Sequence, residues 1–304
     1  PQVGRFGLVY FASAKGKVLT EMSATRLAED EFLLITGAGA YWHDRDLLNG
    51  CLPTSGGVSL QDTTRDYATL LVTGPKSPAI IAAVSGLSTS QEDFPWLSHQ
   101  PCQIAGCWVT AIRVSFAGEA GWEIHCDMAD VLTVYDQIMK AGAPHQLGHF
   151  GMLALDSMRL EKGYRSWKSD LTSDYTMLES GLGRWVKFDK ADFVGRSALQ
   201  AEHQAGSKRQ FAMLTLDDPV DGNSDPFGEA VYLSVVQCDG VDSGLVVSAG
   251  YGHRVNKSIA MAVVDTEKLV SASQISVAVV GRQRSAHLVP AHALYDLNDE
   301  KLRG

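Results

Sequence analysis

Residues Ser115–Ile124 have the sequence SFAGEAGWEI, in which two glycines interrupt an otherwise strand-like region. Val109–Ser115 precedes the loop and Trp122–Cys126 follows it, and both are rich in the apolar, β-branched and aromatic residues that favour strands. A short glycine-containing connection between two such segments is typical of a β-hairpin. We therefore expect two antiparallel strands joined by the loop Phe116–Gly121.

This hairpin carries two carboxylates. Glu119 lies in the predicted loop, where we expect solvent around it. Glu123 lies between Trp122 and Ile124 on the returning strand, so it projects to the opposite face from both. A carboxylate beside large apolar residues needs a partner, because an unpaired buried charge costs several kcal/mol. Two partners fit equally well: an internal arginine, or the 2-amino and N3 hydrogens at the edge of a pterin ring.

A second informative segment is Ala154–Asp170, ALDSMRLEKGYRSWKSD, most of which belongs to a helix predicted from about Gly151 to Lys162. Asp156 and Arg159 are three residues apart and can pair on one helix face. The loop that follows carries Tyr164, Arg165 and Trp167. An arginine among aromatic rings suits a stacked ring with a carboxylate tail, although an ordinary intrahelical ion pair explains the same spacing.

The rest of the chain divides into two regions of different character. Before residue 205 the sequence mixes strands with helices, at Val18–Leu27, Glu31–Thr36, Tyr67–Thr73, Pro75–Gly86 and Ala129–Ala141. After Gly206 helix signals are few, and short β-rich runs lie at Phe211–Leu216, Ala230–Val236, Gly244–Val247, Ile259–Val264 and Ile275–Val280. We expect an α+β body in residues 1–205 and a small all-β barrel or sandwich in residues 206–304.

The two motif segments together resemble the aminomethyltransferase, or glycine-cleavage T-protein, family. SFAGEAGWEI is similar to its signature Y-x-G-E-x-G-x-E, and residues 154–172 are similar to the adjoining A-x-x-S-x-R-x-E-x-G-x segment. With GLGRWVKFDK (181–190) and DFVGRSAL (192–199), the match is closest to the C-terminal folate-binding regions of dimethylglycine and sarcosine dehydrogenases. The resemblance extends from about Gly4 to Asp296 and includes GLVVSAGYGHRVNKSIA (244–260) in the barrel.

The resemblance implies a three-lobed cloverleaf that binds tetrahydrofolate, with a C-terminal barrel and a first lobe truncated at its N-terminus. Glu123 would then bind the pterin edge, and Arg159 would lie in the folate pocket with the folate-binding candidates Phe116, Tyr164 and Trp167. The segment Gly16–Glu21 places Glu21 where the family has a catalytic Asp. Its role would be to stabilise developing positive charge near the folate N5 and N10 atoms.

Two substitutions depart from the family pattern. Phe116 replaces the signature Tyr and lacks its phenolic hydrogen bond. Glu21 is one methylene longer than Asp, which displaces the carboxylate by over an ångström and can reduce the rate substantially.

The segment Thr36–Ala40 (TGAGA) lacks the third glycine of a dinucleotide-binding fingerprint, so it is expected to be a plain turn. We therefore expect any FAD on a separate domain that the chain does not contain.

Composition narrows the range of partners. The chain has 304 residues and a formal net charge of -9, without a Lys/Arg cluster, so no nucleic-acid partner is expected. The longest apolar runs fall far short of the ~20 residues that cross a membrane. The five cysteines show no metal-ligand spacing, which favours reduced thiols, no metal site, and a cytoplasmic or mitochondrial-matrix location.

The resemblance leads to three functional hypotheses. In the leading one, tetrahydrofolate captures formaldehyde or an iminium produced from an N-methyl amine by a flavin dehydrogenase domain or subunit, giving 5,10-methylenetetrahydrofolate. In the second, the chain is a stand-alone tetrahydrofolate-dependent demethylase or aminomethyltransferase. In the third, it is a non-catalytic regulatory relative of dimethylglycine dehydrogenase, which the changes at Glu21 and Phe116 keep open. A folate-binding iron–sulfur assembly protein is disfavoured, because Tyr164 follows Lys162-Gly163 where a Cys is needed.

Overall fold

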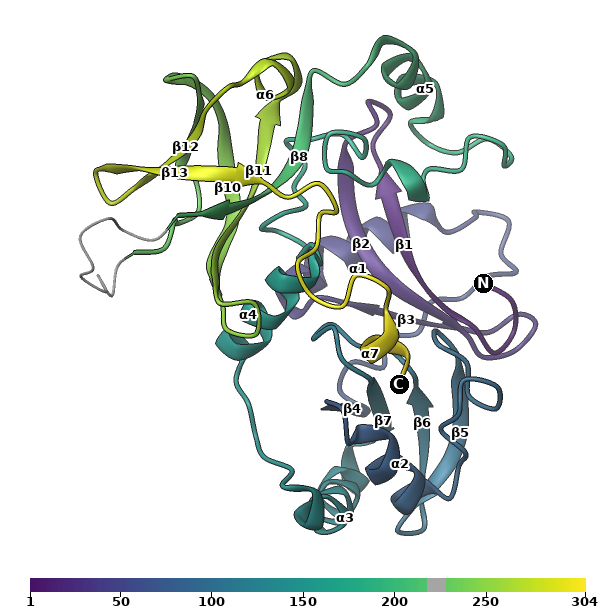
Figure 1. Cartoon of the computed structure of the whole chain (residues 1–304). Helices are drawn as coiled ribbons and strands as arrows, with labels where there is room; N and C mark the ends of the chain where they lie inside the picture. Colours follow the sequence, from purple (N-terminus) through teal and green to yellow (C-terminus); the bar gives the residue numbers. More distant parts are fainter. Residues whose placement is uncertain (218–227) are drawn as a thin grey trace. The chain divides into compact units, whose positions relative to one another are not determined.

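The structure is a computed structural model that describes residues 1–217 and 228–304 (Figure 1). Its internal contacts divide the chain into two compact units. The first contains residues 1–9, 21–150 and 299–304, and the second contains residues 10–20 and 151–298. The domain boundary after residue 205 remains a sequence-based prediction. The mixed helix and strand content and the C-terminal barrel confirm the predicted fold class.

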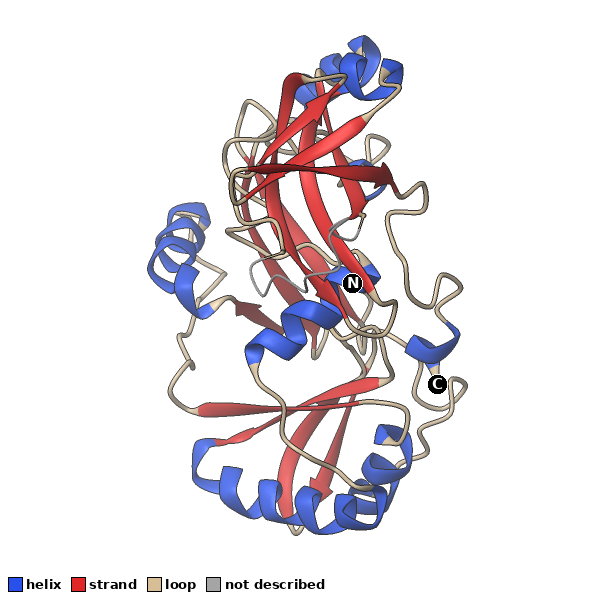
Figure 2. Ribbon diagram, turned by 60° about the vertical axis from the view of Figure 1, so that its left-hand side comes forward, coloured by secondary structure: helices blue, strands red, loops and turns tan. Residues whose placement is uncertain are grey.

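A four-stranded antiparallel sheet forms the centre of the first unit. Its order is β4 (Tyr67–Thr73), β7 (Gly121–Asp127), β6 (Cys107–Ile112) and β5 (His99–Ile104). The helices α2 (Ser77–Ser85) and α3 (Val131–Gly142) contact β7, and helices cover one face of this sheet in Figure 2. Alternate strand residues on that face make the core, including Val72, Val109, Trp122, Ile124 and Cys126. The predicted β6–β7 hairpin and both helices are confirmed.

Strand β5 was not predicted from sequence. Its residues HQPCQI are mostly polar and include Pro101, which cannot donate a ladder hydrogen bond and suits the edge of a sheet. The strand joins β6 through Ala105 and Gly106, both with positive φ (51° and 85°). Two consecutive residues of this kind form the tight turn that matches the twist of a hairpin.

A second, three-stranded sheet has the order β1 (Phe6–Ala12), β2 (Val18–Arg26) and β3 (Phe32–Thr36). Strands β2 and β3 confirm the predicted pair, and β1 was missed. A short 3-10 helix (Ala38–Ala40) and helix α1 (Tyr41–Cys51) follow β3, so the expected plain turn after Thr36 is wrong. Because β2 and β3 are antiparallel, this strand–helix unit still differs from a dinucleotide-binding βαβ unit.

The second unit contains a closed six-stranded barrel, which resolves the choice between barrel and sandwich. Its order is β10 (Val241–Gly252), β11 (Lys257–Asp265), β8 (Arg209–Leu216), β13 (Arg282–Leu288), β12 (Ile275–Val279) and β9 (Val235–Cys238). The predicted strand at 230–236 is corrected to β9, since Ala230–Ser234 are not in a strand and the chain turns at Tyr232 and Leu233, where Leu233 has a φ of 68°. Strand β13 was missed because RQRSAHL shows few apolar residues.

Two helices of the second unit precede the barrel in sequence, and a third lies between β11 and β12. They are α4 (Met152–Lys162), α5 (Arg196–Ala205) and α6 (Thr266–Ser271), while the short α7 (Glu300–Arg303) belongs to the first unit. Helix α4 confirms the prediction at both ends: Gly151 is its N-cap, and Gly163 is its C-cap with a φ of 73°. The remaining 3-10 helices are Met128–Asp130, Ala143–His145 and Gly183–Trp185.

The five cysteines are free thiols that differ widely in exposure. Cys51 is exposed, whereas burial of Cys102 raises the pKa of its thiol to about 11. Only a thiolate reacts quickly with disulfide reagents. In the native chain at pH 8 we therefore expect one fast-reacting thiol, which Cys51→Ser removes. A fast phase that survives this substitution would contradict the assignment.

Candidate functional site

Glu123 lies in the middle of the first unit's four-stranded sheet. It pairs in register with Leu71 of β4 on one side and Ile112 of β6 on the other. Its neighbours Trp122 and Ile124 are completely buried in the core beneath the helices. Glu123 therefore projects from the opposite face, as its position in the strand predicts. Its side chain is 30% exposed, so the carboxylate is accessible from that face.

A histidine on the same face contacts this carboxylate, and a threonine contacts the histidine. His125 Nε2 lies 3.2 Å from Glu123 Oε2, and His125 Nδ1 lies 2.9 Å from Thr69 Oγ1. The His125 side chain is only 5% exposed. Among the described residues, the side chain within hydrogen-bond distance of the Glu123 carboxylate is this histidine, and not the internal arginine considered from sequence.

The hairpin loop places Phe116 and Glu119 differently. Phe116 is 37% exposed, and the loop is held by the Ala117 N–H, which donates to Ser115 Oγ at 3.1 Å. Glu119 is half-buried, which corrects the expectation of a fully solvated side chain. Gly118 precedes it with a φ of 73°, as a tight turn requires.

Arg159 lies in the second unit, where its guanidinium is buried and bonded on all sides. Nε donates to Asp156 Oδ1 at 2.7 Å, which confirms the predicted pairing of these two residues. Nη2 donates to Ser248 Oγ at 2.8 Å, and Nη1 donates to the Tyr164 carbonyl oxygen at 3.1 Å. Nη1 also pairs with Asp170, whose side chain is completely buried.

These contacts organise the loop after α4. Asp170 Oδ2 accepts from the Ser166 N–H at 2.8 Å, so Arg159 and Asp170 together fix the path of residues 164–170. Trp167 packs against a core that includes Val18 and Leu171, and Tyr164 is half-buried. The structure thus joins Arg159 directly to the Tyr164 backbone and places Trp167 on the same braced loop.

Glu21 lies on β2 and is half-buried between Thr20, which is fully buried, and Met22, which is 2% exposed. Ser23 is half-buried and Thr25 is fully buried on the same face. This face of β2 is therefore not simply turned to water.

Sequence reasoning missed two residues of this set, Thr69 and His125. A signal for one of them was available: Glu123 and His125 are two apart on one strand and must share a face. Thr69 required the register of β4 against β7, which sequence alone did not supply.

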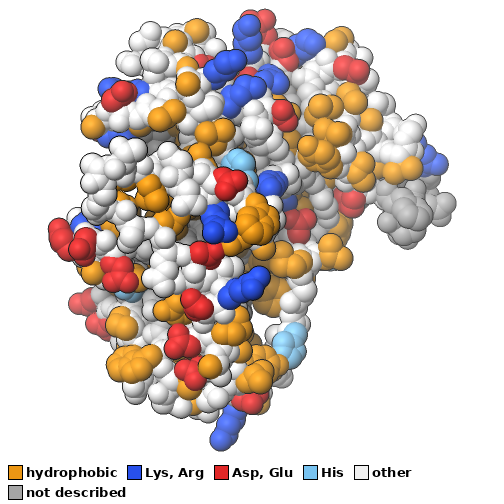
Figure 3. All heavy atoms as spheres, turned by 180° about the vertical axis from the view of Figure 1, so that it is seen from behind, with side chains coloured by type: hydrophobic (Ala, Val, Ile, Leu, Met, Phe, Trp, Pro, Cys, Tyr) orange, Lys and Arg blue, Asp and Glu red, His pale blue; other side chains and the backbone are white. Residues whose placement is uncertain are grey.

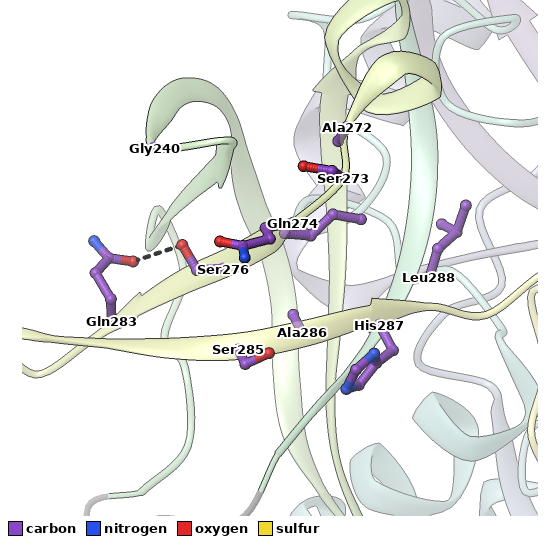
Figure 4. Close-up of a pocket in the computed structure, with 11 residues that line it drawn as sticks. Gly240, Ala272, Ser273, Gln274, Ser276, Gln283, Ser285, Ala286, His287 and Leu288 are labelled. Carbon is purple, nitrogen blue, oxygen red and sulfur yellow. Dashed lines mark hydrogen bonds between the residues drawn. The ribbon is translucent and has the colours of Figure 1, made fainter.

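A cavity of about 770 Å³ borders strands β12 and β13 of the barrel (Figure 4). Small and polar residues line it, including Ser276, Gln283, Ser285 and His287, and Ser276 donates to Gln283 at 3.2 Å. None of the site residues predicted from sequence belongs to this lining.

The face of the molecule in Figure 3 carries charges of both signs, with Lys and Arg side chains interspersed with Asp and Glu. Within residues 1–217 and 228–304, no helix combines the length and apolar character of a membrane crossing. Across the same residues, no three His, Cys, Asp or Glu side chains gather in a way that could hold a metal ion.

The fold and the hairpin site define an aminomethyltransferase-type protein. A family model of the GCVT N-terminal domain matches residues 1–190, and one of the glycine cleavage T-protein C-terminal barrel domain matches residues 209–296. The chain belongs to the glycine-cleavage T-protein family. The aminomethyltransferase T of Bartonella henselae has the same fold, with a TM-score of 0.79 over 96% of this chain and 77% of that one at 21% identity.

Curated relatives indicate which branch of the family the chain resembles. It is 32% identical over 292 residues to mouse mitochondrial dimethylglycine dehydrogenase, covering 95% of this chain and 33% of the relative. It is 37% identical to mouse mitochondrial sarcosine dehydrogenase, covering 76% and 24% respectively. An aminomethyltransferase of Desulfitobacterium hafniense is 25% identical, covering 92% and 73%. The chain therefore spans about a third of the length of the dimethylglycine dehydrogenase that it matches.

Proposed function

We propose that this chain binds tetrahydrofolate and directs the transfer of a one-carbon unit to it. The observation that carries the proposal is Glu123, a partly exposed carboxylate that His125 holds on the sheet face opposite the helical core. The motif in which it lies resembles the hairpin signature of the family, whose model matches residues 1–190.

The chemistry of Glu123 fits a pterin. An ionised carboxylate only accepts hydrogen bonds, and its two oxygens offer about four acceptor positions. His125 occupies one position on Oε2, and the side chain is exposed enough to receive a ligand. The 2-amino and N3 hydrogens of a pterin form a matching pair of donors, and such a bidentate contact fixes orientation as well as affinity.

The other predicted residues take supporting roles in this proposal. Glu21 is the catalytic carboxylate that stabilises positive charge as it develops near the transferred carbon. Phe116 offers an exposed ring at the hairpin loop, where it can pack against the ligand but not donate to it. Each guanidinium nitrogen of Arg159 already donates to a protein group, so we assign it the role of bracing its own loop, which carries Tyr164 and Trp167.

The proposed reaction is the capture of formaldehyde, or the equivalent iminium, formed by oxidation of an N-methyl amine. Tetrahydrofolate supplies the nucleophilic N5 amine, and its condensation with formaldehyde gives 5,10-methylenetetrahydrofolate and water. The oxidation belongs to a flavin dehydrogenase domain or subunit, which we infer from the relationship to dimethylglycine and sarcosine dehydrogenases. The chain itself orients the folate and keeps bulk water from the reacting carbon.

Anaerobic calorimetric titration with tetrahydrofolate tests this proposal. We expect binding that Glu123→Gln weakens by about 1–3 kcal/mol, because the amide loses one acceptor and the charge of the hydrogen bond. Glu119→Gln is the matched control, since it removes an equal charge from the same hairpin and should leave affinity nearly unchanged.

Two results would count against the proposal. A folded chain that binds no tetrahydrofolate would favour the regulatory relative over an enzyme. Equal affinities for wild type and Glu123→Gln would remove Glu123 from the pterin site. If binding is established, turnover of an N-methyl or aminomethyl donor without any flavin partner would favour the stand-alone transferase.

A further inference from the structure

The contacts of Glu123 extend behind it into a short row of polar side chains. Thr69 and His125 pair directly in register across β4 and β7, and Glu123 lies two residues before His125 on the same face. The row runs Thr69 Oγ1, His125 Nδ1, His125 Nε2, Glu123 Oε2, with separations of 2.9 and 3.2 Å between residues. From this geometry we propose that His125 is a positioning residue that aims the Glu123 carboxylate at its ligand. The inference rests on the proposed function of Glu123 as the pterin acceptor.

The donor and acceptor groups of Glu123 and Thr69 determine the orientation of the His125 imidazole ring. Glu123 can only accept, so the proton between the two side chains lies on His125 Nε2. Thr69 has a hydroxyl that can donate to Nδ1 when the imidazole is neutral and accept from it when the imidazole is charged. The threonine therefore holds the same ring orientation in both protonation states.

Burial distinguishes the roles of the two residues. His125 is 5% exposed and lies between two strands, with Thr69 and Thr110 as its direct cross-strand neighbours. A ligand on the open face meets the Glu123 carboxylate, which is 30% exposed. His125 thus acts through Glu123 by occupying one acceptor position on Oε2.

This arrangement selects for a ligand edge with two donors. A free glutamate samples several side-chain rotamers, and ordering it on binding costs affinity. The bond from His125 orders the carboxylate beforehand, with Oε1 and the second position of Oε2 directed to the ligand. A donor pair such as the pterin 2-amino and N3 hydrogens uses both oxygens, whereas a single donor gains less from the alignment.

Two substitutions of His125 test whether Glu123 needs a hydrogen-bond donor at the Nε2 position or the imidazole ring itself. Gln places its amide nitrogen near the position of Nε2 and can still donate to Glu123, whereas Asn reaches only the position of Nδ1. We expect His125→Asn to weaken tetrahydrofolate binding about tenfold, from the loss of one charge-assisted hydrogen bond, and His125→Gln to stay within about twofold of wild type. The double variant His125→Asn/Glu123→Gln should bind no more weakly than Glu123→Gln alone, because the histidine has nothing left to position.

The outcomes separate this inference from the proposed function. If Glu123→Gln weakens binding but His125→Asn does not, the positioning role is wrong and the function stands. If neither does, the function of Glu123 itself fails. Equal losses for Asn and Gln, in chains with wild-type thermal unfolding, would overturn the role of the Nε2 donor. If His125→Asn does not fold, Thr69→Val leaves the imidazole in place and removes its Nδ1 partner. Weaker binding by Thr69→Val then supports the inference, and unchanged binding overturns it.

Discussion

Replacing Gly163 by alanine is expected to lower the free energy of unfolding by about 2–5 kcal/mol, the sum of a left-handed backbone penalty and an unrelieved steric overlap. Gly163 is the C-cap of α4 and has a φ of 73°. A Cβ built there would overlap the carbonyl oxygen of His292 and come within 3.0 Å of its carbonyl carbon. Both are backbone atoms, so the overlap cannot be relieved by a change of rotamer.

Gly86 provides a matched control for this substitution. It is the C-cap of α2 with a φ of 70°, and nothing lies within 4 Å of a Cβ built there. Gly86→Ala therefore carries only the backbone penalty, about 1–2 kcal/mol. Urea unfolding of both variants measures the difference. Equal destabilisation by the two substitutions would show that the backbone near residue 292 moves to accommodate the methyl group.

Local patterns predicted the hairpin and the helix that carry the two main family motifs. Helix α4 was predicted within one residue of its start and at its observed last residue, and the β6–β7 hairpin was predicted from its glycine-containing loop. The missed strands β5 and β13 and the missed helix α1 share a different cause: each lacks a clear apolar period. Strand β1 is nearly all apolar and helix α5 is amphipathic, so both were missed although their sequences carry a usable pattern. Strand β13 forms because its neighbours β12 and β8 pair with it and close the barrel, which is a property of the whole fold.

In the candidate site, too, local patterns predicted some features, while others depend on the whole fold. The direction of Glu123 followed from alternation along one strand, and the Asp156–Arg159 pair followed from helical spacing. Thr69, Asp170 and Ser248 reach their partners across 56, 11 and 89 residues respectively. Such contacts depend on strand register and loop path. No periodicity in the sequence encodes them.

Removing the Asp170 carboxylate is expected to be as damaging as the change at Gly163. Asp170 is completely buried and pairs with Arg159, which is itself 2% exposed. Asp170→Ala leaves a buried guanidinium without its main counter-charge and the Ser166 N–H without its acceptor. Breaking one partner of a buried pair costs about 3–5 kcal/mol, chiefly because the remaining charge stays desolvated.

Asp156 allows a direct comparison, because it bonds the same guanidinium from the solvent side. Its carboxylate lies 2.7 Å from Arg159 Nε but is 49% exposed, so water can replace it. Asp156→Ala should therefore cost less than about 1 kcal/mol, as for other exposed ion pairs. Denaturant unfolding of the two variants distinguishes a loop braced by buried charge from one braced by packing alone. Similar small losses for both would mean that water reaches Arg159 once Asp170 is gone, and that packing of Trp167 and Leu171 holds the loop.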